Sequence, residues 1–141
     1  MPNADTGFNE FADQIERFVG KQPECRWVFA SLGQTVYFSL LQLVDAVVGN
    51  SSSGLLEAPS FNIATINIGD RQKGRVRGDT VIDVAATQSE ISGALEAVFS
   101  GQFIKNVKNS VNPLFKKDTA ENIARIFIDY KASSSPKAFY D

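Results

Sequence analysis

Residues 45–61, DAVVGNSSSGLLEAPSF, constrain the fold of this chain more than any other segment. The apolar run at residues 46–48 has strand composition, a turn of small polar residues follows it, and helix-type residues begin after Gly54. Such a unit gathers backbone N–H groups and hydroxyls around one point, where an anion such as a phosphate binds. A plain exposed turn has the same composition, so residues 50–54 are either a phosphate site or a simple surface loop.

Similar patterns along the chain predict the remaining elements. Short apolar runs predict strands at residues 26–31, 46–48, 63–68 and 80–84. Apolar residues at helical spacing predict helices at residues 8–20, 35–44, 54–61, 87–99 and 118–130. Pro59 should limit the third helix to about two turns or distort it. Strands that alternate with helices through short loops predict an α/β fold with a parallel sheet.

Two of these helices carry start signals. Thr87 and Glu90 fit a capping box, in which the hydroxyl and the carboxylate each accept from a free backbone N–H of the other residue. Asp118 and Glu121 give the last helix a similar start. The apolar stripe of this last helix is Ile123, Ile126, Phe127 and Tyr130.

The composition limits the chemistry available to the chain alone. A net charge of −2 argues against general affinity for nucleic acid or anionic membranes. A single cysteine, Cys25, excludes an internal disulfide and a thiolate zinc site, and the lack of histidine excludes imidazole catalysis and His-ligated metals. Cys25 and Trp27 have no catalytic partner nearby in the sequence, so we expect both to be structural. With no signal-peptide pattern and no membrane-length apolar run, we expect a cytoplasmic location.

The length of 141 residues predicts one domain, at residues 1–130, followed by an unpatterned tail at residues 131–141 that we expect to be disordered. Polar segments at residues 31–34, 50–54 and 69–77 would lie at the carboxyl ends of the strands, where parallel α/β sheets bind ligands. The last of them holds four positive charges and could fold over a diphosphate, with an Arg making a bidentate contact, or could be a solvated loop.

Glu57 follows the small polar turn by about one helical turn. Its charge would repel a phosphate, so beside one it must reach neutral donors such as sugar hydroxyls. The alternative is a favourable charge near a helix N-terminus, which contributes ~0.3–1 kcal/mol.

Two long segments resemble a known family. GNSSSGLLEAPSF at residues 49–61 and NIGDRQKGRVRGDTVIDV at residues 67–84 resemble the C-terminal domain of the UDP-N-acetylglucosamine 2-epimerase family. The resemblance is to its hydrolysing branch, which makes N-acetylmannosamine or a related sugar for sialic-acid-type biosynthesis. PNADTGFNE at residues 2–10 and SLGQTVYFSLLQLVDAVVGN at residues 31–50 resemble the same region in the same order, so the match spans roughly residues 2–130.

This resemblance implies one of two Rossmann-like domains in a GT-B arrangement, with helices on both faces of a parallel sheet and UDP or UDP-N-acetylglucosamine in the cleft between the domains. Ser51 and Ser52, with N–H groups through Gly54, would hold the diphosphate. Glu57 would accept from the ribose hydroxyls, and Arg75 would pair with the diphosphate. The segment from Gln34 to Tyr37 would line the uracil pocket. The implied UDP-binding residues are Gln34, Tyr37, Asn50, Ser51, Ser52, Ser53, Gly54, Glu57 and Arg75.

The chain also departs from the family pattern. The acid–base carboxylates and a nucleotide-contacting histidine of the family belong upstream of residue 1, so we expect no catalytic residue, cofactor or metal here and a dependence on the missing N-terminal catalytic domain. The loop at residues 112–118 lacks the glycines usual after Asn-Pro in the family. The first strand of the domain would come just before Pro2 and lie between the strands at residues 26–31 and 46–48. We therefore expect these two strands to close together, or another chain, as in a homo-oligomer, or other atoms of the parent enzyme to fill the gap.

Together these patterns favour the nucleotide-binding domain of a hydrolysing UDP-N-acetylglucosamine 2-epimerase that is inactive alone. The alternatives are a domain of a non-hydrolysing epimerase, a non-catalytic module that binds a UDP-sugar, and a GT-B protein that uses another nucleotide sugar.

Overall fold

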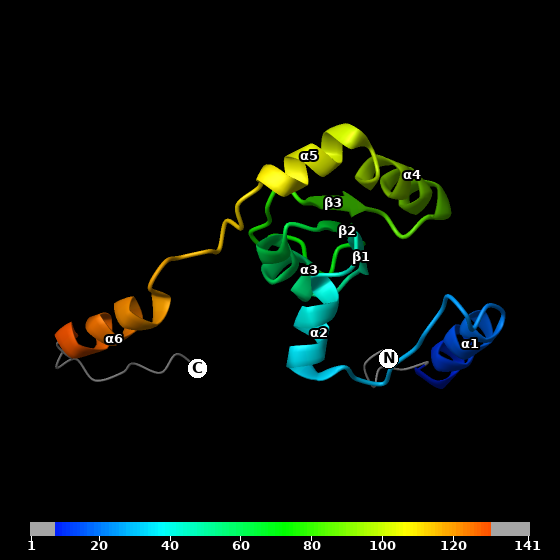
Figure 1. Cartoon of the computed structure of the whole chain (residues 1–141), viewed down its shortest axis with the longest axis horizontal. Helices are drawn as coiled ribbons and strands as arrows, with labels where there is room; N and C mark the ends of the chain where they lie inside the picture. The colour runs from blue at the N-terminus through cyan, green and yellow to red at the C-terminus, as the bar shows by residue number, and fades with distance from the viewer. Residues whose placement is uncertain (1–7, 131–141) are drawn as a thin grey trace, which may run out of the picture.

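A three-stranded parallel sheet forms the centre of the molecule (Figure 1). The computed structural model describes residues 8–130, and its strands are β1 (Ala46–Gly49), β2 (Ala64–Ile68) and β3 (Val81–Val84). They pair in sequence order, with Ala46 opposite Ala64 and Thr65 opposite Val81. The fold is therefore α/β and Rossmann-like, and the predicted strands at residues 46–48, 63–68 and 80–84 are confirmed.

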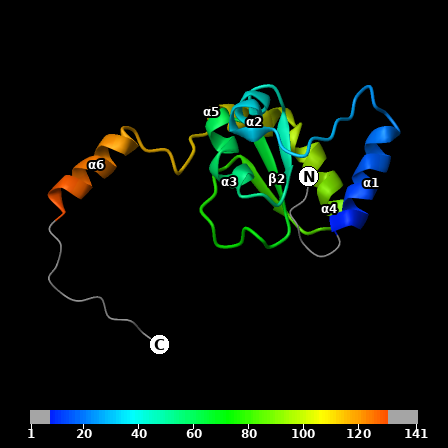
Figure 2. The same cartoon turned by 90° about the horizontal axis from the view of Figure 1, so that it is seen from below.

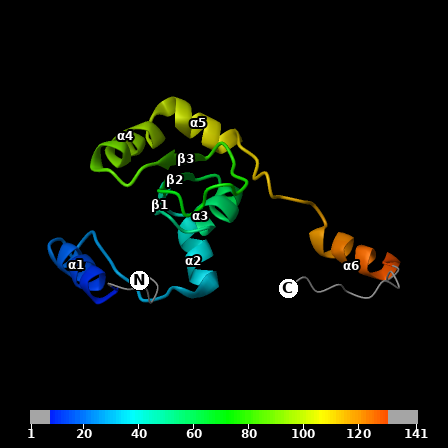
Figure 3. The ribbon, with the colours of Figure 1, turned by 180° about the vertical axis from the view of Figure 1, so that it is seen from behind.

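Helices cover both faces of the sheet (Figure 3). Alternate residues of β2 explain why: Ala64 and Ile66 are buried among apolar residues of α4 (Gln88–Val98) and α5 (Gly101–Asn109), whereas Thr65 contacts α3 (Ser53–Leu56) on the other face. A second apolar cluster packs α2 (Gly33–Leu41) against the turn that precedes β2. The buried members of the two clusters are Ala64, Ile66, Ala94, Val98 and Val107, and Leu41, Ala58 and Ile63.

Pro59 interrupts the third helix as predicted. The segment forms the single turn α3 and then a short 3₁₀ helix, η1 (Ala58–Phe61), with Pro59 in its first turn. Asn62 ends this unit in a left-handed conformation and bonds through its side-chain amide to the carbonyl of Val107. After this interruption the chain enters β2, and Asn62 holds the start of the strand next to α5.

The capping box of α4 forms only in part. The Thr87 hydroxyl accepts from the Glu90 N–H at 3.4 Å, but the Glu90 carboxylate accepts from the N–H of Ala85 at 2.7 Å instead of from Thr87. The backbone N–H of Thr87 is bonded to the Ala85 carbonyl, and so it is not free for the reciprocal contact.

Sequence patterning did not predict α5, because its apolar residues are few. The helix is defined by its start, where the Ser100 hydroxyl accepts from the N–H of Phe103 at 3.3 Å. Only Val107 is buried along it.

Replacing Ser100 with alanine should lower the free energy of unfolding by about 1 kcal/mol, because the Phe103 N–H loses its acceptor. Urea unfolding followed by circular dichroism measures the change. Ser92 lies exposed within α4, and Ser92→Ala is the matched control, with unchanged or slightly raised stability expected. Equal values for the two variants would show that the cap adds nothing.

The prediction of a buried strand at residues 26–31 is wrong. This segment is irregular chain between α1 (Phe8–Gly20) and α2, and Trp27 and Phe29 are 69% and 54% exposed. A strand exists only when its backbone pairs with a neighbour, and β1 pairs only with β2 among the described residues. The local composition favours an extended chain but cannot supply that partner, and the two predicted strands do not close together.

The two terminal helices lie away from the sheet in all views (Figures 1 and 2). Helix α1 has the predicted bounds. Arg26, in the segment after α1, attaches that segment to the helix: its guanidinium donates to the Phe18 carbonyl at 3.0 Å and makes a cation–π contact with the Phe18 ring. Helix α6 (Thr119–Asp129) forms as predicted, but its stripe is exposed: Ile123 is 49% and Phe127 76% accessible. Asp118 starts it in a left-handed conformation without a side-chain cap.

Across residues 8–130, no helix is long and apolar enough to cross a membrane. The predicted tail at residues 131–141 lies outside the described residues.

Candidate functional site

A chain of polar contacts joins α2 to α3 and the residue that follows it. The Tyr37 hydroxyl lies 2.5 Å from the Ser53 hydroxyl, which donates in turn to the Glu57 carboxylate. Tyr37 comes from the middle of α2, Ser53 is the first residue of α3, and Glu57 comes directly after that turn. All three side chains are half-buried, so the contacts fix the direction of the Glu57 carboxylate.

This polar chain borders a cavity of about 560 Å³. Gln34, Tyr37 and Glu57 line it together, with a wall made by Phe29 to Gly33. The structure therefore brings together three residues that the sequence predicted for the base and the ribose of a nucleotide. The irregular segment before α2, although not a strand, supplies the apolar side of this cavity.

Residues 50–54, the serine turn, are held against the sheet through Gly54. The Thr65 hydroxyl of β2 donates to the Gly54 carbonyl at 2.9 Å, and a Cβ on Gly54 would lie 2.6 Å from the Thr65 methyl carbon. Only glycine allows this approach. The N–H of Gly54 already bonds to the Ser51 carbonyl, whereas the N–H groups of Ser51 and Ser52 make no hydrogen bond within the described residues. These two amides and the hydroxyl hydrogens of Ser51 and Ser52 are open to an anion, while the Ser51 hydroxyl oxygen accepts from the N–H of Ser53 at 3.4 Å.

The basic loop between β2 and β3 is tied to this turn by Gln72. The Gln72 side chain is 3% exposed, and its amide nitrogen donates to the Asn50 carbonyl at 2.7 Å. The Gln72 carbonyl accepts from the N–H of Arg75 and from the guanidinium of Arg77. Sequence patterning drew attention to the charges of this loop but missed Gln72, the residue that attaches it.

Arg75 itself is exposed, and its guanidinium makes no hydrogen bond or ion pair within residues 8–130. Its backbone lies three residues after Gln72, on the loop that contacts the turn. The role of Arg75 toward a diphosphate stays a prediction.

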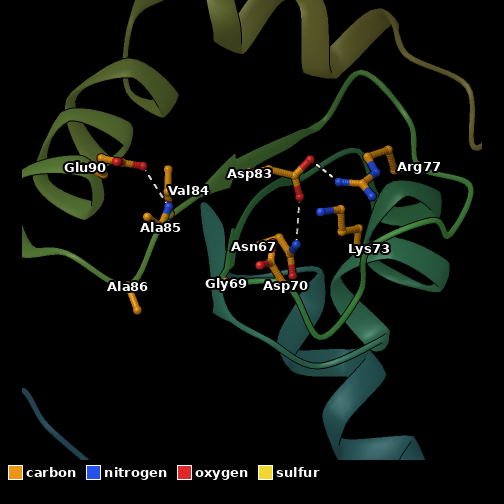
Figure 4. A pocket seen from close by; sticks show the side chains of 10 residues that line it. All are labelled: Asn67, Gly69, Asp70, Lys73, Arg77, Asp83, Val84, Ala85, Ala86 and Glu90. Atoms are coloured by element: carbon orange, nitrogen blue, oxygen red, sulfur yellow. Dashed lines mark hydrogen bonds and ion pairs between the residues drawn. The ribbon is translucent and has the colours of Figure 1, made fainter.

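A second polar cavity, of about 470 Å³, lies at the carboxyl ends of β2 and β3 (Figure 4). Asn67 and Asp83 occupy paired positions of the two strands and are joined by a hydrogen bond of 2.7 Å, and Asp83 also pairs with Arg77. Sequence patterning missed Asn67 and Asp83. The available signal was a polar residue near the carboxyl end of each of two otherwise apolar strands.

Across residues 8–130, no cluster of three or more carboxylate or thiol side chains is arranged to hold a metal ion. Cys25 is an exposed free thiol, and its hydrogen bonds among the described residues go to Gln22 and Glu24, in its own turn. The candidate site is therefore a polar binding surface made of hydroxyls, amides, one carboxylate and a basic loop.

Comparison with known proteins assigns the chain to a family. The family model described as UDP-N-acetylglucosamine 2-epimerase matches residues 1–128. The chain belongs to the UDP-N-acetylglucosamine 2-epimerase family. Both segments that carried the resemblance, at residues 49–61 and 67–84, lie inside the matched range.

Curated relatives of this epimerase family are considerably longer than the chain. The chain is 40% identical to polysialic acid biosynthesis protein P7 of Escherichia coli over 141 residues, which cover 99% of this chain and 36% of the relative. It is 38% identical over 104 residues to GDP/UDP-N,N'-diacetylbacillosamine 2-epimerase (hydrolyzing) of Campylobacter jejuni, covering 74% of this chain and 27% of that protein. It is 30% identical over 103 residues to UDP-N-acetylglucosamine 2-epimerase of Neisseria meningitidis, covering 72% of this chain and 26% of that protein. The matched part of the chain thus covers between 26% and 36% of the length of these relatives.

Proposed function

We propose that this chain is the nucleotide-binding part of a hydrolysing UDP-N-acetylglucosamine 2-epimerase, whose products are UDP and N-acetylmannosamine or a related sugar. The observation that carries the proposal is the cavity in which Gln34, Tyr37 and Glu57 meet beside the serine turn. The hydrolysing type is favoured because the relative named as a hydrolyzing 2-epimerase is 38% identical, against 30% for the relative named UDP-N-acetylglucosamine 2-epimerase without that word.

In this proposal each part of UDP has a separate partner. The uracil lies against the segment from Gln34 to Tyr37, and the Glu57 carboxylate accepts from the ribose hydroxyls. The diphosphate is bound by the amides of Ser51 and Ser52 and by the nearby hydroxyls, with Arg75 closing from the basic loop. Bonds from fixed N–H groups to a charged leaving group stabilise the charge that develops on UDP as the sugar departs.

The acid–base groups that act on the sugar are supplied, in this proposal, by the rest of a longer protein. The 141-residue chain alone should bind UDP weakly and release none from UDP-N-acetylglucosamine. Robust turnover by this chain would contradict that division of labour.

Replacing Glu57 with glutamine should weaken UDP binding about tenfold, because a hydrogen bond to a charged group contributes about 1.5–3 kcal/mol. Isothermal titration with UDP and with 2′-deoxy-UDP measures the effect. The unmodified chain should prefer UDP, and the Glu57→Gln variant should lose that preference. Glu96 lies exposed on α4, and Glu96→Gln is the matched control.

The same titration with Arg75→Ala tests the basic loop. We expect weaker UDP binding and a smaller dependence of affinity on salt, because one guanidinium no longer meets the diphosphate. Unchanged affinity would remove Arg75 from the site, and a persistent preference for UDP in Glu57→Gln would remove Glu57.

A further inference from the structure

Asn112 lies in the exposed segment that joins α5 to α6. Its side chain is 8% exposed, whereas the neighbouring Val111 and Leu114 are 76% and 42% exposed. Burying an amide is costly unless its polar atoms are hydrogen-bonded, so a buried Asn in an exposed segment is held by specific contacts. Pro113, which follows it, disfavours a helical backbone at Asn112, so α5 cannot continue through this position.

The Asn112 side chain forms a hydrogen bond with each of three groups. Its amide nitrogen donates to the Leu56 carbonyl at 3.0 Å and to the Ser60 hydroxyl at 2.7 Å. Its oxygen accepts from the N–H of Leu114 at 2.9 Å. A carbonyl only accepts and an N–H only donates, so the reverse orientation of the amide would break two of the three bonds. The contacts therefore fix both the place and the orientation of this side chain.

These contacts bracket Glu57, the residue proposed for the ribose. Leu56 ends α3, and because the last carbonyls of a helix have no partner within it, Asn112 supplies one. Ser60 lies three residues after Glu57 and donates its own N–H to the Glu57 carbonyl at 2.9 Å. The Ser53 hydroxyl thus directs the Glu57 carboxylate, while Asn112 holds the backbone that carries it.

The same segment also touches the basic loop between β2 and β3. A Cβ on Gly78 would lie 3.1 Å from the ring carbon Cδ of Pro113, so glycine at this position lets the loop pack against the proline ring. Asn112 and Pro113 therefore contact two elements of the proposed nucleotide site, the turn that carries Glu57 and the loop that carries Arg75.

We propose that Asn112 is a positioning residue for the ribose of UDP. By holding the backbone on both sides of Glu57, it keeps the carboxylate where that group accepts from the ribose hydroxyls. This role rests on the proposed function, which gives Glu57 its ligand, and Asn112 acts only through Glu57. Its loss leaves the carboxylate chemically intact but frees the backbone that carries it, and the hydrogen bonds to the ribose weaken as their geometry worsens.

Isothermal titration of the 141-residue chain with UDP and with 2′-deoxy-UDP measures this role as the ratio of the two dissociation constants. A variant that is partly unfolded binds both ligands more weakly by the same factor, so the ratio reports the ribose contact and not stability. Asn112→Ala should reduce the preference for UDP about threefold to tenfold, the effect of losing one hydrogen bond. Asn109→Ala is the matched control, because Asn109 is exposed and its amide donates to the Lys105 carbonyl within α5.

Ser60→Ala keeps the test valid if Asn112→Ala fails to fold. Ser60 is exposed, and this change removes one acceptor of the Asn112 amide while the bond to the Leu56 carbonyl remains. The preference for UDP should therefore fall about twofold, which is less than in Asn112→Ala. Ser92→Ala, on the exposed side of α4, is the control and should leave the preference unchanged.

The double variant with Glu57→Gln shows whether Asn112 acts through Glu57. We expect no further loss of preference when Asn112→Ala is added to Glu57→Gln, because the contact that Asn112 positions is already gone. A further loss, or an undiminished preference in Asn112→Ala and Ser60→Ala, would overturn the role of Asn112 and leave the proposed function standing. If the unmodified chain binds no UDP, or binds UDP and 2′-deoxy-UDP equally, the proposed role of Glu57 is itself overturned, and that of Asn112 with it.

Discussion

Replacing Gly54 with alanine should lower the free energy of unfolding by about 1–3 kcal/mol, the usual cost of forcing an extra carbon into a packed interior. The new Cβ would lie 2.6 Å from the methyl carbon of Thr65, a residue that is 2% exposed and bonded to the Gly54 carbonyl. The better helix propensity of alanine offsets at most about 1 kcal/mol of this cost. Urea unfolding of the two proteins measures the difference.

Thr65→Ser provides the matched rescue for this variant. Serine keeps the hydroxyl that donates to the Gly54 carbonyl and removes the methyl group that meets the new carbon. The double variant Gly54→Ala with Thr65→Ser should therefore be more stable than the sum of the single changes predicts, with a coupling of about 1 kcal/mol or more. Strict additivity would show that the clash is relieved elsewhere, for example by movement of the serine turn.

Replacing Gln72 with glutamate should destabilise the chain by about 3 kcal/mol or more near pH 7, because it removes a buried donor and introduces a buried charge. The Gln72 side chain is 3% exposed, and its amide nitrogen faces the Asn50 carbonyl, to which a carboxylate cannot donate. Gln102 is exposed on α5, so Gln102→Glu makes the same chemical change without burial and should have little effect.

The Gln72→Glu variant should also depend on pH in a defined direction. Burial raises the pKa of the introduced carboxyl above its unfolded value of about 4.3, so the protonated form is the one that folds more easily. The stability loss should therefore grow as the pH rises above the unfolded pKa and shrink as the pH falls toward it. Urea unfolding of variant and parent at pH 5 and pH 8 measures this difference. A constant loss would indicate that the carboxylate instead pairs with a cation of the loop, such as Arg77.

The central strands and the flanking helices other than α5 were predictable from the sequence because local pattern decides them. β1, β2 and β3 are short, mainly apolar runs bounded by polar turns, and the middle strand β2 is buried on both faces of the sheet, as such a run requires. The segment at residues 26–31 has the same composition, yet it forms no strand among the described residues, because pairing depends on a neighbour that composition does not reveal. Helix α5 shows the reverse case, in which a capping serine and one buried residue suffice.

The site was predictable to the extent that its residues lie in one motif. Ser53, Gly54 and Glu57 follow β1 directly, and the fold could only place them at its carboxyl end. The contact of Gln72 with Asn50 and the pair of Asn67 with Asp83 join residues from separate segments. Their meeting depends on strand register and on the path of the loop, and no local pattern encodes either.

The connection between β2 and β3, residues 69–80, makes a parallel crossover without a helix. Most such crossovers are ordered by a helix that packs on the sheet, whereas this one is held by Gln72 on the Asn50 carbonyl and by Arg77 on Asp83. Any molecule that binds this segment preferentially in its folded form therefore also stabilises the attachment of β3, by mass action. Ligand occupancy and the integrity of one edge of the sheet are thus a single linked equilibrium.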